Sequence, residues 1–412
     1  MNHDRLPPST PGHKRRSATL GAVLVVGALA ASACSSSSAG GSTATTAAGA
    51  ATSTAATSAT TAAGSTSTAA GTATAPTSAG TATSTAPAAS NASIADIAAA
   101  GTAFVSLLDA NQKAAGLFDY ANTTQKAKWS NFPNTIFART GIQWGTMSTT
   151  QQTAWLTMVQ KSLSTEGYNR FLAEWKADDA LATQQGGGNN MFGSNLFYIA
   201  LLGTPSATTP WMYQFGGHHV TLNVTIAGGR ISPTPSFVGD QPTSYTDANG
   251  STVVPLGDIS NDAYALLASL DATQKTAAIL GTSVIDVVLG PGQDGKTIAT
   301  EGLLGSKMTE AQQTQFLKLI MHYAGMANDT ETAKRRTEIK ADLPNTAFAW
   351  YGSTTVGQSG YFRITGPTVV IEYSPQGGGG GGGGQGAAAT GAPTHIHGIY
   401  RDPTNDYGNK YD

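Results

Sequence analysis

The sequence predicts an α+β fold built from two homologous halves, each a helix–helix–hairpin unit, that form one compact domain. LDANQK at 108–113 recurs as LDATQK at 270–275, and MSTTQQTAWL at 147–156 recurs as MTEAQQTQFL at 308–317. Residues 203–226 align without a gap on residues 352–375. The three matches keep the same order at the similar offsets of 162, 161 and 149 residues. Collinear repeats of this kind indicate an internal duplication.

Each half is expected to start with a helix that carries the LDA-x-QK segment. A second helix is expected to follow the Ser148 or Thr309 position, because both residue types are favoured helix N-caps. Residues 262–280 have the apolar spacing of one helix, whereas 220–224 and 369–373 alternate with the period of a strand. Helices followed by paired strands predict the α+β class.

The N-terminus has the pattern of an export signal, assigned to residues 1–33. Four basic residues precede the apolar run of residues 20–31, and small residues lead to Cys34, the single cysteine of the chain. The apolar run is short for a membrane-spanning helix. The small residues and the cysteine resemble a bacterial lipobox, in which the thiol of Cys34 would be lipidated. The alternative is a cleaved, freely secreted protein.

Residues 34–92 are interpreted as a disordered tether. They consist almost wholly of Ser, Thr, Ala and Gly, and no charged residue occurs between positions 35 and 95. Such a segment cannot bury enough apolar surface to offset its chain entropy. The globular domain is therefore expected at 93–412, with halves at about 93–245 and 255–412.

The charge balance argues against nucleic acid as a partner. The chain has 23 basic and 25 acidic residues, of which four basic residues and Asp4 lie in the signal segment. The remaining 19 basic and 24 acidic residues leave a net charge of −5, whereas binding to phosphates requires a basic surface. The expected membrane association is through the N-terminal lipid anchor only.

Four of the five histidines beyond the signal segment lie in two short motifs. GGHHV contains His218 and His219, and THIHG contains His395 and His397. If both motifs are extended, His395 and His397 share one face, and His219 faces away from Val220. Three imidazoles on neighbouring strands suit Zn or another divalent transition metal, including Cu or Fe.

Three further residues could complete a polar pocket. Glu372 occupies the position of the second half that matches Asn223, on the same face as His219 in the first half. Tyr361 and Arg363 lie on the preceding strand, where an arginine could bind a carboxylate or a phosphate in a bidentate manner. We therefore take His219, Glu372, Arg363 and Tyr361 as candidate catalytic residues, and His218, His219, His395 and His397 as candidate metal ligands.

The sequence leaves three interpretations of the histidines open. They could bind a shared metal, or act without metal as general base or oxyanion donor, or serve packing alone. The glycine run at 377–384 lacks the spaced glycines and lysine of a phosphate loop and is interpreted as a flexible connector. No HExxH, GxSxG or CxxC motif is present.

Several motifs together resemble a known family. GTPS…PW…GGHHVTLNVTI, TPSFVGDQP, GYFRITGPTVVIEY and THIHGIYRDPTNDYG are similar to segments of the bacterial family called domain of unknown function 3500. The resemblance covers most of residues 95–408. Members are often exported, and no activity is established for the family. This chain differs from the family pattern in its glycine run and its long tether.

These observations lead us to expect an exported, lipid-anchored protein that faces outside the cytoplasm. Its His-rich site is expected to take a small-molecule ligand, and metal-assisted hydrolysis is the first reaction expected, with an oxidative metal reaction second. A non-catalytic cell-surface protein that binds a ligand or a metal is the alternative. A structural envelope protein with packed histidines is the third.

Overall fold

The computed structural model of the protein describes residues 91–186, 190–376 and 391–411. The predicted signal peptide at 1–33, the lipidation site at Cys34 and the predicted tether up to residue 90 lie outside these residues. The same holds for the glycine run at 377–384 that we interpreted as a connector. None of the described helices is both long and apolar enough to cross a membrane.

A 13-stranded mixed sheet forms the framework of the described residues. Its strands are β1 (Leu117–Phe118), β2 (Ile142–Gln143), β3 (Tyr198–Leu202), β4 (Trp211–Gly216), β5 (Val220–Ala227), β6 (Arg230–Ser232), β7 (Ser236–Val238), β10 (Ile279–Gly281), β11 (Leu303–Leu304), β12 (Ala347–Gly352), β13 (Gly360–Thr365), β14 (Val370–Gln376) and β15 (His395–Arg401). A separate two-stranded ribbon pairs β8 (Tyr245–Thr246) with β9 (Thr252–Val253).

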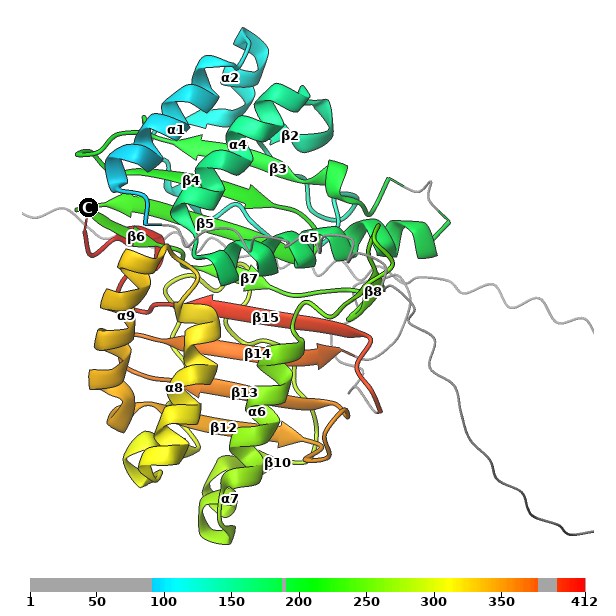
Figure 1. The fold of residues 1–412 in the computed structure, drawn as a ribbon, viewed down its shortest axis with the longest axis vertical. Coiled ribbons are helices and arrows are strands. Elements are labelled where there is room, and N and C mark those ends of the chain that lie inside the picture. Colours follow the sequence, from blue (N-terminus) through cyan, green and yellow to red (C-terminus); the bar gives the residue numbers. More distant parts are fainter. Residues whose placement is uncertain (1–90, 187–189, 377–390, 412) are drawn as a thin grey trace, which may run out of the picture. The chain divides into compact units, whose positions relative to one another are not determined.

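The strand order joins the two predicted halves in one sheet. The main path runs β1-β3-β4-β5-β7-β15-β14-β13-β12-β10, and β2, β6 and β11 pair beside it (Figure 1). The pairs β1–β3 and β10–β12 are parallel, and the other pairs are antiparallel. Strands β7 and β15 meet in the middle, where Ile399 pairs with Phe237 and Tyr400 with Ser236. This central pairing brings the THIHG motif from the end of the chain beside elements of the first half.

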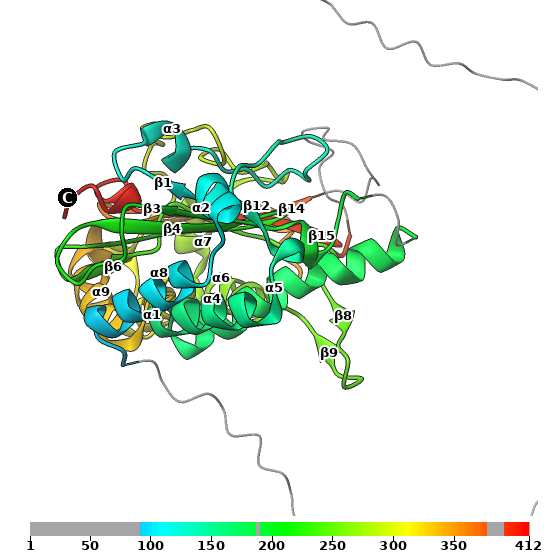
Figure 2. The same cartoon turned by 90° about the horizontal axis from the view of Figure 1, so that it is seen from above.

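The helices of the described residues are α1 (Ile94–Ser106), α2 (Ala110–Gly116), α3 (Thr123–Lys126), α4 (Thr149–Ser162), α5 (Thr165–Gln184), α6 (Gly257–Ser269), α7 (Ala272–Ala278), α8 (Glu310–Ala324) and α9 (Asp329–Asp342). Helices α1, α4, α5, α6, α8 and α9 cover one face of the sheet, and α3 lies with long loops on the other face (Figure 2). The helix-covered face carries the main core, in which Trp155, Phe215, Trp350 and Phe362 are fully buried. Each such side chain stabilises the fold by roughly 1.5–3 kcal/mol.

The predicted N-caps of the second helix in each half are confirmed. Ser148 caps α4 and Thr309 caps α8, and each forms a capping box with a glutamine three residues later. These glutamines also reach across to the ends of α1 and α6, since Gln151 donates to Leu107 O at 2.9 Å and Gln312 donates to Ser269 O at 2.8 Å. The shared MS/T-x-x-QQ pattern therefore specifies both a helix start and a contact between helices.

The single helix predicted over 262–280 is wrong. The chain forms α6 up to Ser269 and α7 from Ala272, and Ile279 already belongs to β10. The break occurs because Asp271 acts as an N-cap and accepts a hydrogen bond from Gln274 N at 2.8 Å. Helical apolar spacing continued through this cap and concealed it.

The long helix α9 was not predicted, because its sequence lacks a clear apolar stripe. Among its residues Glu331, Arg335 and Ile339 are buried, so two of its three buried side chains are charged. Both charged residues form ion pairs with partners outside α9. Ion pairs rather than hydrophobic contacts position much of this helix, and periodicity does not detect them.

Candidate functional site

The GGHHV motif forms the turn of the β4–β5 hairpin. Gly217 N donates to Val220 O at 3.0 Å, so His218 and His219 are the two residues at the tip. His219 has a φ of +63°, in the left-handed region that non-glycine residues adopt with strain. The extended conformation predicted for these two histidines is therefore wrong, because strand β5 begins only at Val220. A tight hairpin with two central residues needs the turned backbone instead.

The THIHG motif lies at the start of β15, as its predicted extended form requires. His395 pairs with Gln376 and His397 with Ser374 on β14, and the two histidine side chains share one face of the sheet. On the other side of β15, Ile396 forms a bridge with Asp240, which follows β7. This pairing places the start of β15 beside the tip of the β4–β5 hairpin.

Three of the four predicted metal ligands converge. The Nε2 atoms of His219 and His395 lie 2.7 Å apart. One candidate ligand atom from each of His219, His395 and His397 lies within 4.8 Å of the other two. His218 stacks on His219 with ring centroids 3.6 Å apart, but it is not part of this group of three. We call His219, His395 and His397 the histidine cluster.

Carboxylates orient the imidazoles at the edge of the cluster. Asp178 on α5 lies 2.7 Å from His218 Nδ1, and Asp286 lies 3.1 Å from His397 Nδ1. The other ring nitrogen of His397 lies 3.4 Å from the amide nitrogen of Asn131. A carboxylate on Nδ1 fixes the tautomer and orientation of the ring and leaves Nε2 as an acceptor, which is the usual arrangement of histidines that bind metals. In His397 a metal would replace the 3.4 Å contact of Nε2 with the Asn131 amide.

Burial favours the neutral form of His219 and His395 in the cluster. It lowers the pKa of His395 to about 2 and the pKa of His219 well below the ordinary value, and the neighbouring imidazoles add to both shifts. Burial also lowers the pKa of His218, and this effect outweighs the opposing effect of Asp178. At neutral pH these imidazoles are therefore unprotonated, which is the form that binds metals.

Glu372 lies near the histidine cluster, but its carboxylate already accepts hydrogen bonds from other residues. It is a diagonal neighbour of His397 on the same sheet face, since Glu372 pairs with Ile399 and Ser374 pairs with His397. Its carboxylate accepts hydrogen bonds from Val288 N and Leu289 N at 2.8 Å and from the Tyr361 hydroxyl at 2.7 Å. Glu372 therefore holds the 282–302 loop on the sheet and does not complete the histidine cluster.

Tyr361 and Arg363, like Glu372, already have bonding partners within the chain. Arg363 forms an ion pair with Glu301 at 2.5 Å, so a carboxylate of the chain itself occupies the position where we expected a ligand. Burial raises the pKa of Tyr361 well above its ordinary value, with the nearby Glu372 carboxylate adding to the shift. Tyr361 is thus a hydrogen-bond donor to Glu372 at all ordinary pH values.

No sequence pattern indicated Asp178, Asp286 or Asn131 as site residues. Asp178 lies on a long helix, Asp286 in a loop of the second half and Asn131 in a loop of the first half. None of them stands in a motif with the histidines. Only a spatial model of the sheet and its loops could identify them.

The donor set fits a divalent transition metal. Nitrogen ligands 2.0–2.1 Å from a tetrahedral Zn²⁺ are about 3.3 Å apart. The 2.7 Å separation of the His219 and His395 nitrogens is that of a hydrogen bond between neutral rings, and spreading them by about 0.6 Å gives the tetrahedral spacing. Three imidazoles would leave a fourth position for water or a ligand.

The described residues thus define a mixed-sheet α+β protein with helices on one face and three convergent histidines beside its central strand pair. A family model described as "Protein of unknown function (DUF3500)" matches residues 90–409. The chain therefore belongs to the DUF3500 family, as its motifs predicted. No curated protein and no solved structure matches the chain.

Proposed function

We propose that the protein binds one divalent transition metal ion, with Zn²⁺ the best match, through His219, His395 and His397. The convergence of these three imidazoles within 4.8 Å carries the proposal. The lowered pKa values of His219 and His395 support it, because unprotonated rings need not lose a proton before binding.

The first reaction that this site would support is hydrolysis of a small molecule. A bound Zn²⁺ with an open position supplies a water of pKa about 7 and polarises a carbonyl or phosphoryl oxygen. The chain's own residues hold and orient the ligands: Asp286 keeps His397 in one orientation, and Asp178 supports His219 through the stacked ring of His218. His219 and His397 are only 4% and 9% exposed, which limits a substrate to a small group at the mouth of the site.

Non-catalytic metal or ligand binding at the cell surface is the second candidate. The burial of the cluster favours it, because a sequestered ion exchanges slowly and has little room for a substrate. We also propose that the protein is exported and anchored through a lipid on Cys34, on the basis of the N-terminal sequence pattern. Metal-assisted hydrolysis and non-catalytic binding are both compatible with a lipid-anchored protein outside the cytoplasm.

We further propose that the two halves arose by internal duplication. Matched repeats in the sequence and the recurrence of capping boxes, hairpins and parallel edge pairs in the same order support this origin. The turns of the β4–β5 and β13–β14 hairpins close with the same hydrogen bond, from Gly217 N to Val220 O and from Gly366 N to Val369 O, and they differ in carrying His218-His219 and Pro367-Thr368.

Metal analysis of the purified full-length chain tests the metal site. We expect one Zn²⁺ per chain after loading and dialysis, and less than about a tenth of that in His397→Ala and in His395→Ala, because two imidazoles rarely hold Zn²⁺ alone. Asp286→Asn should bind about 10–100-fold more weakly, because the oriented ring is lost.

His322→Ala provides the matched control. His322 bonds Glu166 at 2.8 Å and Asp262 at 2.6 Å between helices, away from the cluster, so its removal should leave the stoichiometry at one. A wild-type chain that stays metal-free with Zn, Cu, Fe, Co, Ni and Mn would eliminate the metal site. Full stoichiometry in His397→Ala would eliminate this set of ligands.

Hydrolysis and plain binding can then be separated. Zn-loaded protein is assayed against small ester, amide and phosphoester substrates, with His397→Ala as the inactive reference. Turnover that follows the metal content supports the hydrolase, whereas stoichiometric metal without turnover on any class of substrate supports the binding protein.

A further inference from the structure

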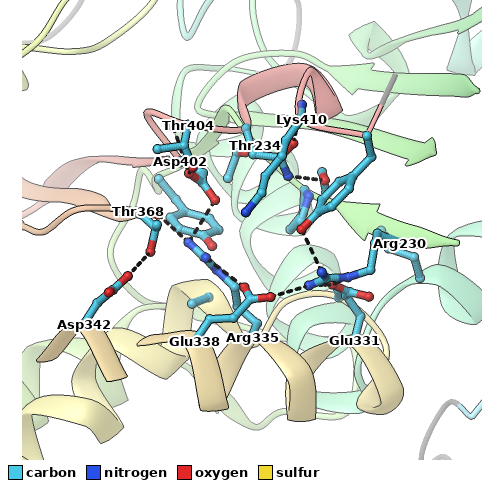
Figure 3. Close-up of a pocket in the computed structure, with 18 of the residues that line it drawn as sticks. Arg230, Thr234, Glu331, Arg335, Glu338, Asp342, Thr368, Asp402, Thr404 and Lys410 are labelled. Atoms are coloured by element: carbon cyan, nitrogen blue, oxygen red, sulfur yellow. Dashed lines mark hydrogen bonds and ion pairs between the residues drawn. The ribbon is translucent and has the colours of Figure 1, made fainter. Parts of the chain in front are cut away.

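A second polar site lies apart from the histidine cluster, between α9, β6 and the C-terminal segment. A partly open cavity of about 270 Å³ is lined there by side chains from α9 below and from residues 400–411 above (Figure 3). This volume falls just below the ~300–1,000 Å³ typical of pockets for drug-sized ligands. A ligand of one small ring fits such a space.

Five of the seven charged side chains on the cavity wall pair with one another, whereas Asp342 accepts from the Thr368 hydroxyl and Lys410 lies over the Tyr411 ring. Arg230 binds Glu331 at 2.5 Å and Glu338 at 2.9 Å, and Arg335 binds Asp402 at 3.1 Å and Glu338 at 3.2 Å. Glu338 thus bridges both arginines, as the dashed lines in Figure 3 show. An anion in the cavity would meet the carboxylates, and a cation would meet the two guanidinium groups. The wall therefore favours a neutral ligand.

The wall nevertheless offers many hydrogen bonds. Each oxygen of Glu338 receives one bond from an arginine and can accept another, since a carboxylate oxygen has two lone pairs. The hydroxyl of Thr234, a lining residue that is 1% exposed, has no hydrogen-bond partner among the described residues. Groups that both donate and accept, as hydroxyls do, match this mixture of donors and acceptors.

Aromatic rings supply the remaining wall. Tyr400 and Tyr411 line the cavity, and the hydroxyl of Tyr411 accepts a bond from Arg230 at 2.7 Å. An aromatic ring with polar groups around it provides both an apolar surface and hydrogen bonds. We propose that this cavity binds one neutral sugar ring, with Glu338 accepting from its hydroxyls and the tyrosines packing against its C–H groups.

Titration calorimetry and saturation-transfer NMR on the metal-free full-length chain test this proposal independently of the metal site. The probes are D-glucose, D-galactose, D-mannose, L-rhamnose and myo-inositol, with inorganic phosphate, L-glutamate and L-lysine as charged comparisons. At least one neutral probe should bind with a Kd of roughly 1 mM or tighter.

Glu338→Gln should weaken that binding about 10-fold or more, because bonds to a charged acceptor are stronger than those to a neutral one. Lys340→Gln, an exposed change on the same helix, should leave it unchanged. If Glu338→Gln does not fold, Tyr411→Ala tests the proposal instead. Tyr411 is half-buried next to the end of the chain, and the loss of its side chain should also abolish sugar binding.

Three outcomes would overturn the proposal. The first is that no neutral probe binds at about 10 mM, well above the expected Kd. The second is that a charged probe binds more tightly than any sugar. The third is that sugar binding stays intact in both Glu338→Gln and Tyr411→Ala.

Discussion

The two hairpin turns of the sheet share a framework and differ in chemistry. Gly217 N donates to Val220 O in the first turn, and Gly366 N donates to Val369 O at 2.8 Å in the second. In each case an aspartate on a long helix forms a hydrogen bond with the turn. Asp178 on α5 bonds His218, and Asp342 on α9 accepts from the Thr368 hydroxyl at 3.0 Å.

Only the first turn meets further histidines. The start of β15 places His395 and His397 beside the β4–β5 turn. Thr368 of the second turn instead lines the cavity between α9, β6 and the C-terminal segment, with Arg335 and Asp402. The comparison shows that the framework is independent of the site. Side chains at the turn tips, and the strand that arrives beside them, decide what each end of the sheet can bind.

The sharpest test changes the same position in both turns to asparagine. Asparagine tolerates a left-handed backbone, so His219→Asn should keep the turn at its φ of +63°. It removes a ligand, and we expect Zn²⁺ affinity to fall more than about 100-fold, or roughly 2.7 kcal/mol. Competition with a chromophoric chelator measures the affinity.

Thr368→Asn is the matched change and should leave Zn²⁺ affinity within about twofold, because no histidine lies in the second turn. Equal losses in both variants would mean that metal binding follows general stability, and that the two turns do not differ in the proposed way.

A second test concerns Glu372, which aligns with Asn223 of the first half. Glu372→Gln removes a charged acceptor from two backbone N–H groups of the 282–302 loop and should destabilise the protein by about 1–3 kcal/mol. Denaturant titration measures this loss. The Zn²⁺ affinity of the folded variant should stay unchanged. A large drop in affinity would place Glu372 in the metal site after all.

A third test concerns the pH dependence of the stability of the metal-free protein. The folded pKa values of His219 and His395 lie below the ordinary unfolded value of ~6.5, so the unfolded chain binds more protons as the pH falls. Stability is therefore complete above about pH 6.5 and declines below it, by up to ~1.4 kcal/mol per pH unit for each imidazole.

Denaturant titrations between about pH 7 and pH 5 measure this slope. His219→Asn should make it shallower, and Thr368→Asn should not alter it. An unchanged slope in His219→Asn would show that other groups cause the loss of stability.

Local patterns predicted several elements well. The S/T-x-x-Q segments placed the N-caps of α4 and α8, and alternation placed Val220, Leu222 and Val224 on the face of β5 that packs in the main hydrophobic core. These features depend on residues within a few positions of each other. The short range of these patterns also explains the two errors. The apolar spacing of a helix continues past Asp271 although this residue caps a new helix, and the alternation of a strand continues into GGHHV although this motif forms a turn.

The sequence by itself determined the α+β class and the family, and it singled out the histidines of two motifs as candidate ligands. The tertiary structure alone decided which of them meet. The β7–β15 pairing closes a connection of more than a hundred residues and brings His219 to His395 and His397. The tertiary structure also brings Glu372 to the 282–302 loop, Asp178 to His218 and Asp286 to His397. Strand order and loop placement arise from long-range packing, which no local spacing in the chain encodes.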